Sequence, residues 1–188
     1  MDTPPPPSRR TRRLPARSAL TLSVAVALLT PAMPPAEAGD RTRIWEVSLR
    51  AHKGQWVSWQ GNGQVTADRT AIGEWEKVDL IMLDEPGSIY LLRAKTNRRY
   101  AGLDANGRLV VNRATPGEGE PFRLTGRPGQ KSCVETQLCG LQVTRDRRFK
   151  HRHITAEGGG GRGLVARATR WGDWEKFGVK VWSYREEE

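Results

Sequence analysis

One short motif returns along the chain, and this repeat constrains the fold more than any other feature. Residues 73–78 read GEWEKV and residues 172–177 read GDWEKF. A weaker copy, GEGEPF, lies between them at residues 117–122, so the motif glycines are 44 and 55 residues apart. The unit openings also match, since SLRA at residues 48–51 is similar to LLRA at residues 91–94. Self-similarity of this kind predicts an architecture of three repeated units.

Each unit has room for four short strands. Beyond residue 38 the chain has short apolar runs separated by Gly-rich turns, and no long segment with apolar residues at helical spacing. Three such units suit a closed barrel capped by hairpins, because closure removes exposed strand edges. The competing propeller typically needs at least four blades. The predicted fold class is therefore all-β, a β-trefoil of three repeats.

The first 38 residues have the order of a secretory signal peptide. Basic residues come first, an apolar run follows at residues 18–29, and small residues and prolines end in AEA at residues 36–38. The apolar run has 12 residues, whereas a bilayer span needs about 20, so no permanent membrane anchor is expected. The arginine pair at residues 9–10 leaves the twin-arginine route as an alternative to general export. The protein is predicted to be secreted.

Residues 39–188 are expected to form one domain, with repeats at about 44–86, 87–126 and 139–184. Without the signal peptide, 26 basic and 19 acidic residues remain, and the net charge falls from +10 to +7. A basic surface favours anionic partners. Arginine is interleaved with aspartate and glutamate, however, which is typical of a solvated surface.

The chain has two cysteines, Cys133 and Cys139. Export delivers them to a compartment where disulfides persist, so we expect one bridge between them. The loop that it closes is short, so its stabilisation is expected to be modest, about 2 kcal/mol. Two cysteines make only half of a structural zinc site, and no metal is predicted.

The tryptophans of the motif, Trp75 and Trp174, are predicted to pack where a strand enters the barrel. Their neighbours Glu76 and Glu175 are interpreted as structural parts of the same motif. The alternative makes both tryptophans sugar-stacking platforms, but repeats retain at equivalent places what the core needs. Six apolar residues are expected inside the barrel with them: Val78, Leu80, Phe122, Leu124, Phe177 and Val179.

The first unit also resembles a known family. It combines SLRAHKGQWVS at residues 48–58 with ADR at residues 67–69 and GEWE at residues 73–76. This order is similar to the fascin-like β-trefoil unit, and the resemblance covers roughly residues 47–182. It implies the trefoil fold. Fascins bundle actin with four such domains, and one exported domain lacks that multivalency, so the resemblance implies a glycan-binding or accessory module instead.

A sugar site is predicted from aromatic residues outside the motif. Trp59 is expected on the strand face opposite Val57, exposed beside Gln60 and Asn62. Trp171 precedes the glycine of the third motif in a turn. Flat aromatic surfaces flanked by amides suit sugar rings. The candidate ligand-binding residues are therefore Trp59, Gln60, Asn62 and Trp171, with core packing of Trp59 as the alternative.

Catalysis and metal binding find little support. The acidic residues that could form a catalytic pair, Glu74, Glu76, Asp173 and Glu175, occupy repeat-equivalent positions, which structure explains better than hydrolysis. Sequence motifs of nucleophilic, phosphate-binding or zinc enzymes do not occur. His151 and His153 would share one face of a strand without a third ligand. No enzymatic activity and no cofactor are expected.

The densest positive segment, RDRRFKHR at residues 145–152, combines basic residues with Phe149. Such a combination is used for nucleic acids, but a solvated hairpin is the preferred interpretation, and export argues against a nucleic-acid partner.

The sequence thus predicts a secreted, monomeric, non-enzymatic module that binds an extracellular glycan or another anionic polymer. The alternative is a protein-interaction module. It would be either a protease inhibitor that presents residues 126–139 or an actin-binding fascin-like protein.

Overall fold

The computed structural model describes residues 41–84, 88–126, 134 and 136–187. The predicted signal peptide and Cys133 lie outside these residues, so the export signal and the disulfide stay predictions. Within the described part, no helix is long and apolar enough to cross a membrane.

The described residues form twelve strands and four short 3-10 turns. The strands of the first unit are β1 (Thr42–Arg50), β2 (Trp56–Trp59), β3 (Val65–Arg69) and β4 (Val78–Asp84). Those of the second are β5 (Ile89–Ala94), β6 (Tyr100–Leu103), β7 (Leu109–Arg113) and β8 (Phe122–Thr125). Those of the third are β9 (Leu138–Val143), β10 (His153–Ala156), β11 (Leu164–Ala168) and β12 (Phe177–Glu187).

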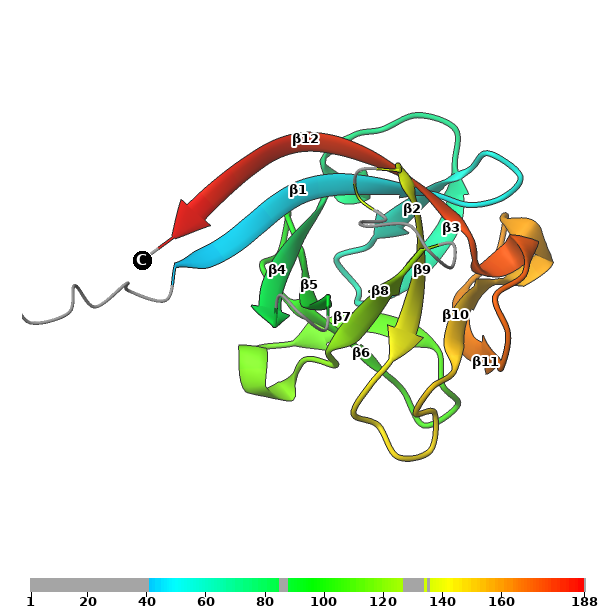
Figure 1. The fold of residues 1–188 in the computed structure, drawn as a ribbon. Helices are drawn as coiled ribbons and strands as arrows, with labels where there is room; N and C mark the ends of the chain where they lie inside the picture. The colour runs from blue at the N-terminus through cyan, green and yellow to red at the C-terminus, as the bar shows by residue number, and fades with distance from the viewer. Residues whose placement is uncertain (1–40, 85–87, 127–133, 135, 188) are drawn as a thin grey trace, which may run out of the picture. The chain divides into compact units, whose positions relative to one another are not determined.

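The first and last strands of each unit build a closed barrel (Figure 1). The ring runs β1, β4, β5, β8, β9, β12 and back to β1, and every neighbouring pair is antiparallel. The inner strands of each unit form the hairpins β2–β3, β6–β7 and β10–β11. This confirms the predicted all-β fold, a β-trefoil of three units.

The three hairpins interlock around a pseudo-threefold axis. Single bridges join Gln64 to Val110, Arg108 to Val165, and Gly163 to Thr66. Each bridge connects the start of β3, β7 or β11 to the next hairpin in the ring. The backbone also repeats the pattern, because Val111, Ala166 and Ala67 each donate a hydrogen bond to the turn of a neighbouring hairpin at 2.7–2.9 Å. The axis is therefore defined by backbone pairing.

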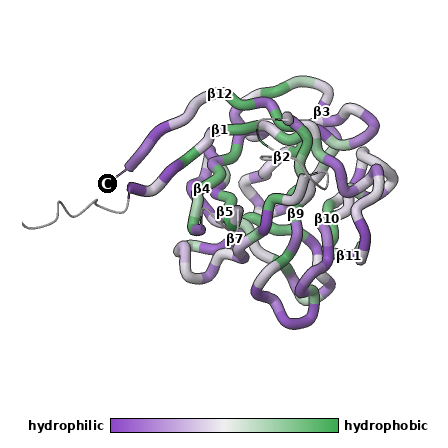
Figure 2. The backbone as a smooth tube through the Cα atoms, in the orientation of Figure 1, coloured by the Kyte–Doolittle hydropathy of each residue, from purple (hydrophilic) through white to green (hydrophobic). Residues whose placement is uncertain are grey.

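Apolar side chains from all three units fill the barrel. The six residues expected inside it are all buried, which confirms that part of the prediction. Figure 2 shows the hydrophobic residues concentrated on the barrel strands and the hydrophilic ones at loops and chain ends. Fully buried large side chains include Phe122, Phe177 and Trp59.

Strands β1 and β12 pair along their whole length, from Thr42↔Glu187 to Arg50↔Gly178. Together they form a ribbon that arches away from the barrel (Figure 1). Val181, Trp182 and Tyr184 are exposed on β12. The repeat pattern of the sequence does not predict this aromatic surface.

A buried ion cluster joins β4, β5 and β12. Asp79 is completely buried and accepts hydrogen bonds from Arg93 Nη2 at 2.7 Å and Arg185 Nη2 at 3.0 Å. Burial by itself would raise the pKa of Asp79, but the bonds from the two guanidinium groups outweigh it, and the pKa lies below its ordinary value. The cluster ties β12 to β4 and β5 across β1.

Replacing Asp79 with asparagine should lower the free energy of unfolding at pH 7 by about 3 kcal/mol, because Arg93 stays buried without its counter-charge. The folded-state pKa of Asp79 is lowered, so its contribution is present above the ordinary pKa of about 4 and is lost as the pH falls through the folded value. Urea unfolding of wild type and Asp79→Asn at pH 7 and at pH 3 should therefore show a difference that shrinks in acid. An equal difference at both pH values would contradict this role.

Candidate functional site

The repeated motif is oriented opposite to the prediction. Trp75 and Trp174 are 45% and 46% exposed, whereas Glu76 and Glu175 are only 5% and 7% exposed. The expectation that these tryptophans pack in the core is therefore wrong. The glutamates, not the tryptophans, are the buried part of the motif.

The reason is a capped 3-10 turn. The motif residues form η1 (Glu74–Glu76) and η4 (Asp173–Glu175). Glu76 Oε2 accepts a hydrogen bond from Gly73 N at 2.7 Å, and Glu175 Oε2 accepts one from Gly172 N at 2.9 Å. A 3-10 turn has three residues per turn, so neighbouring side chains point in different directions. When the glutamate folds back on the turn, the tryptophan before it therefore points away from the glutamate. The carboxylate satisfies an otherwise unpaired N–H and directs tryptophan outward.

The second unit uses the same turn in a shifted register. Its turn is η2 (Pro116–Glu118), and Glu118 Oε2 accepts a hydrogen bond from Ala114 N at 3.0 Å. Gly117 therefore takes the position that tryptophan has in the other two units. The alignment of the three motifs in the sequence places Gly119 there, two residues further along the chain. Glu120 is buried and accepts a hydrogen bond from Arg145 N at 2.7 Å instead. The three residues of this turn include no aromatic side chain.

Trp75 rests on the turn between β2 and β3. A Cβ atom placed on Gly61 would lie 2.8 Å from Trp75 Cη2, so only glycine leaves room for the indole. Gln60 and Asn62 flank this glycine. Gln60 Nε2 donates to Thr66 Oγ1 at 2.9 Å, and Asn62 Oδ1 accepts from Gln64 N at 3.0 Å. The predicted amides thus accompany Trp75, and we call these four residues, 60–62 and 75, the first platform.

Trp59, the aromatic residue predicted beside these amides, is fully buried in the main core. The prediction that it is exposed is wrong. Residues two apart in a strand share a face, so Trp59 lies on the same side of β2 as Val57, which is also fully buried. Trp59 cannot present a face to a sugar.

Trp174 rests in the same way on the turn between β10 and β11. A Cβ atom on Gly159 would lie 3.1 Å from Trp174 Nε1 and 3.3 Å from Lys53 Cγ. Lys176 Nζ donates to Asp173 Oδ1 at 2.7 Å, and this bond lowers the pKa of Asp173. Trp174, Gly159 and Lys53 form the second platform, which has basic neighbours where the first has amides.

Trp171 is half-buried and does not join either platform. Its indole packs against Gly140, where an added Cβ would lie 2.4 Å from Trp171 Nε1, and Lys176 Nζ lies 5.4 Å from the centre of its ring. The structure therefore separates the four predicted ligand residues: Gln60 and Asn62 belong to the first platform, while Trp59 and Trp171 pack elsewhere.

The basic segment at residues 145–152 forms the loop between β9 and β10. Phe149 covers the turn between β6 and β7, since a Cβ on Gly107 would lie 2.7 Å from its ring. Arg148 pairs with Asp146 at 2.8 Å. His151 lies in this loop at φ 67° and His153 begins β10, so the expected shared strand face does not exist. Among the described residues, no group of three His, Cys, Asp or Glu side chains could hold a metal ion.

The cysteine loop is described only in part. Cys139 is buried on β9 opposite Phe177, while Cys133 and most of residues 126–139 lie outside the described residues. The bridge and the inhibitor loop stay predictions.

Comparison with known proteins supports the fold. No protein-family model and no curated protein matches the chain. Among solved structures, a designed threefold-symmetric protein, ThreeFoil, is similar with a TM-score of 0.55 and 13% identity over 72% of this chain and 96% of that chain. A mosquitocidal holotoxin is similar with a TM-score of 0.58 and 11% identity over 73% of this chain and 16% of that chain. At these identities the likeness shows the β-trefoil fold alone.

Besides the repeat, a second pattern in the sequence indicates which side chain of the motif is buried. Glutamate three residues after the cap residue is typical of a turn whose side chain bonds back to the cap N–H. Three pairs have this spacing: Gly73 and Glu76, Thr115 and Glu118, and Gly172 and Glu175. The spacing indicates buried glutamates in the first and third units, and it locates the second copy correctly.

Replacing Glu76 with alanine should lower the free energy of unfolding by about 1–3 kcal/mol, because Gly73 N loses its acceptor in a part-buried turn. Glu74→Ala in the same turn is the control, and its exposed side chain predicts a change below about 0.5 kcal/mol. Urea unfolding curves of both variants measure this. Equal losses would refute the assignment of Glu76 as the buried cap.

Proposed function

We propose that this protein is a non-enzymatic binding module that binds carbohydrate through the two platforms. The observation that carries the proposal is the pair of half-exposed indoles, Trp75 and Trp174, at equivalent places in two units. A solvent-facing indole on a rigid support suits stacking against the apolar face of a sugar ring. Both indoles lie outside the main hydrophobic core, so the barrel does not depend on them for its packing.

The platforms are held ready for a ligand. Each indole lies against a glycine turn, and the 3-10 turn that carries the indole is capped by a buried glutamate, so little side-chain freedom is left to lose on binding. Such preorganisation improves affinity by reducing the entropic cost of association. The amides beside Trp75 supply hydrogen-bond donors and acceptors for sugar hydroxyls.

The two platforms suit different sugars. Gln60 and Asn62 are neutral, which favours a neutral glycan at the first platform. Lys53 lies at the second, which favours an acidic or otherwise anionic unit. Two sites on one domain can also bind one polymer at the same time, which raises the overall affinity.

Several expectations from the sequence belong to the same proposal. We propose that the chain is exported by its first 38 residues, acts as a monomer without a cofactor and has no nucleic-acid partner. The fascin-like resemblance is retained as an interpretation of the repeat motif, and the lack of multivalency continues to argue against actin bundling.

Replacing Trp75 with alanine should weaken binding to a neutral polysaccharide about tenfold, because one stacking surface is removed. The double variant Trp75→Ala/Trp174→Ala should lose retention altogether. Affinity electrophoresis in gels that contain a panel of neutral and acidic polysaccharides measures both. Binding of Trp75→Ala at wild-type strength to every polysaccharide that the wild type binds would overturn the first platform.

Trp182→Ala is the matched control, since Trp182 is exposed to a similar extent but lies on the ribbon. It should bind polysaccharide as the wild type does. Melting temperatures of the Trp75 and Trp174 variants should stay close to wild type, because both platform indoles lie outside the main core. A wild type that binds none of the polysaccharides would contradict the proposed function.

The alternative, a protein-interaction module, is favoured by one observation on the ribbon. Beyond Val179, β12 pairs only with β1 among the described strands, and its exposed side chains include Trp182. An open strand edge is a template for pairing with another chain. A wild type that binds none of the polysaccharides would favour this alternative.

A further inference from the structure

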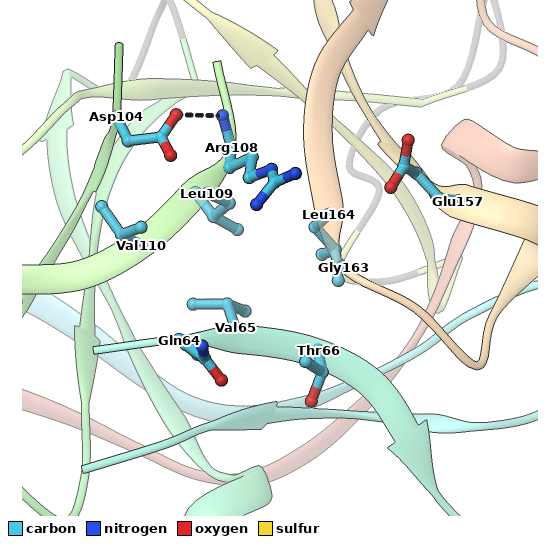
Figure 3. Close-up of a pocket in the computed structure, with 10 residues that line it drawn as sticks. All are labelled: Gln64, Val65, Thr66, Asp104, Arg108, Leu109, Val110, Glu157, Gly163 and Leu164. Atoms are coloured by element: carbon cyan, nitrogen blue, oxygen red, sulfur yellow. Dashed lines mark hydrogen bonds between the residues drawn. The ribbon is translucent and has the colours of Figure 1, made fainter. Parts of the chain in front are cut away.

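A cavity of ≈ 390 Å³ opens where the three hairpins meet at the pseudo-threefold axis. Its walls come from the first residues of β3, β7 and β11 and from the turns before them (Figure 3). We call it the axis cavity, and its lining includes Gln64, Asp104, Arg108, Glu157 and Gly163. Its volume is within the range of small-molecule sites.

One of three equivalent side chains is missing at the cavity. Gln64, Arg108 and Gly163 hold the same position in the three hairpins, as the interlocking bridges show. The backbone of Gly163 lies outside the left-handed region, so its conformation does not require glycine. A Cβ atom placed there would have no neighbour within 4 Å. The absent side chain therefore leaves space rather than relieving strain.

The wall of the cavity supplies both donors and acceptors. Arg108 extends toward the β11 segment (Figure 3), and its guanidinium forms no hydrogen bond or ion pair with another described residue. Asp104 Oδ1 accepts the N–H of Asn106 and of Arg108, each at 2.8 Å, which fixes the carboxylate and leaves Oδ2 for a ligand. Glu157 adds a second carboxylate on the opposite side, 3.6 Å from Arg167 Nη1.

The floor of the cavity is apolar. Val65, Leu109 and Leu164 are the equivalent residues that follow the bridging positions, and all three are buried. An aromatic side chain is not among the lining residues. A ligand here would be held by hydrogen bonds at its edges and by contact with aliphatic groups beneath, not by stacking.

We infer that the axis cavity binds a single neutral sugar ring, such as the end of a glycan chain. Two carboxylates disfavour an anion, and the guanidinium of Arg108 disfavours a cation, so a neutral ligand with several hydroxyl groups fits the wall best. Hydroxyl groups can donate to Asp104 and Glu157 and accept from Arg108 and Gln64. This inference rests on the proposed function and adds an end-recognising site to two stacking platforms.

Isothermal titration of the protein without its predicted signal peptide, residues 39–188, with a panel of free neutral monosaccharides tests the inference. Wild type should bind at least one of them. Gly163→Gln, which restores the side chain found at the equivalent position 64, should weaken that binding about tenfold or more by filling the space. Gly117→Gln is the matched control, because Gly117 also has no positive φ and an open Cβ position but does not line the cavity.

Arg108→Ala provides a second variant that creates space instead of filling it, and its exposed position predicts an unchanged melting temperature. It should also weaken monosaccharide binding about tenfold. Monosaccharide binding that persists in both Gly163→Gln and Arg108→Ala would overturn the axis cavity as the site. A wild type that binds no monosaccharide in the panel would overturn it as well.

The same titration separates this inference from the platforms. Trp75→Ala/Trp174→Ala should lose polysaccharide retention yet bind the monosaccharide as wild type does. Polysaccharide retention without monosaccharide binding would leave the platforms standing and refute the cavity. Monosaccharide binding that is sensitive to Gly163→Gln, without any effect of the tryptophan variants on polysaccharides, would support the cavity and refute the platforms.

Discussion

Closure of the barrel by β1 and β12 is the constraint on which the rest of the structure depends. The two strands come from opposite ends of the domain, and their pairing completes the ring of six. The ring fixes the three hairpins relative to one another, and their interlocking bridges then define the axis. Asp79 reinforces the closure from outside, since its bond to Arg185 joins β12 to β4. Both candidate binding features, the platforms and the axis cavity, depend on this arrangement.

The platforms show how one carboxylate decides the direction of a neighbouring side chain. Glu76 and Glu175 fold back on their turns and accept hydrogen bonds from the backbone N–H groups of Gly73 and Gly172. Once each glutamate is folded inward, tryptophan faces solvent and lies on a glycine of the adjacent hairpin. The same turn in the second unit carries Gly117, so threefold backbone symmetry does not make three equal sites. Function on this fold is a matter of which side chains the common backbone presents.

The fold was predictable because repeat number and turn spacing survive in the sequence, and alternation together with the motif identified six interior residues. The candidate site was only partly predictable. Gln60 and Asn62 were identified as polar residues of the first hairpin, but the aromatic beside them is Trp75, not Trp59. Trp59 was expected on the wrong face, because residues two apart in a strand share a face and Val57 is buried. Repetition of the motif suggested that its tryptophans pack in the core. A capped turn that each unit needs makes the motif repeat just as well.

The sequence by itself determined the number of units and the all-β class, because these follow from local periodicity and from residues with special backbone preferences. Only the tertiary structure decided which tryptophans are exposed, which residues meet at the axis and that Gly163 lines a cavity there. Those properties depend on contacts between hairpins far apart in the chain. A linear pattern of apolar and polar residues records burial on average, but not which neighbour covers which face.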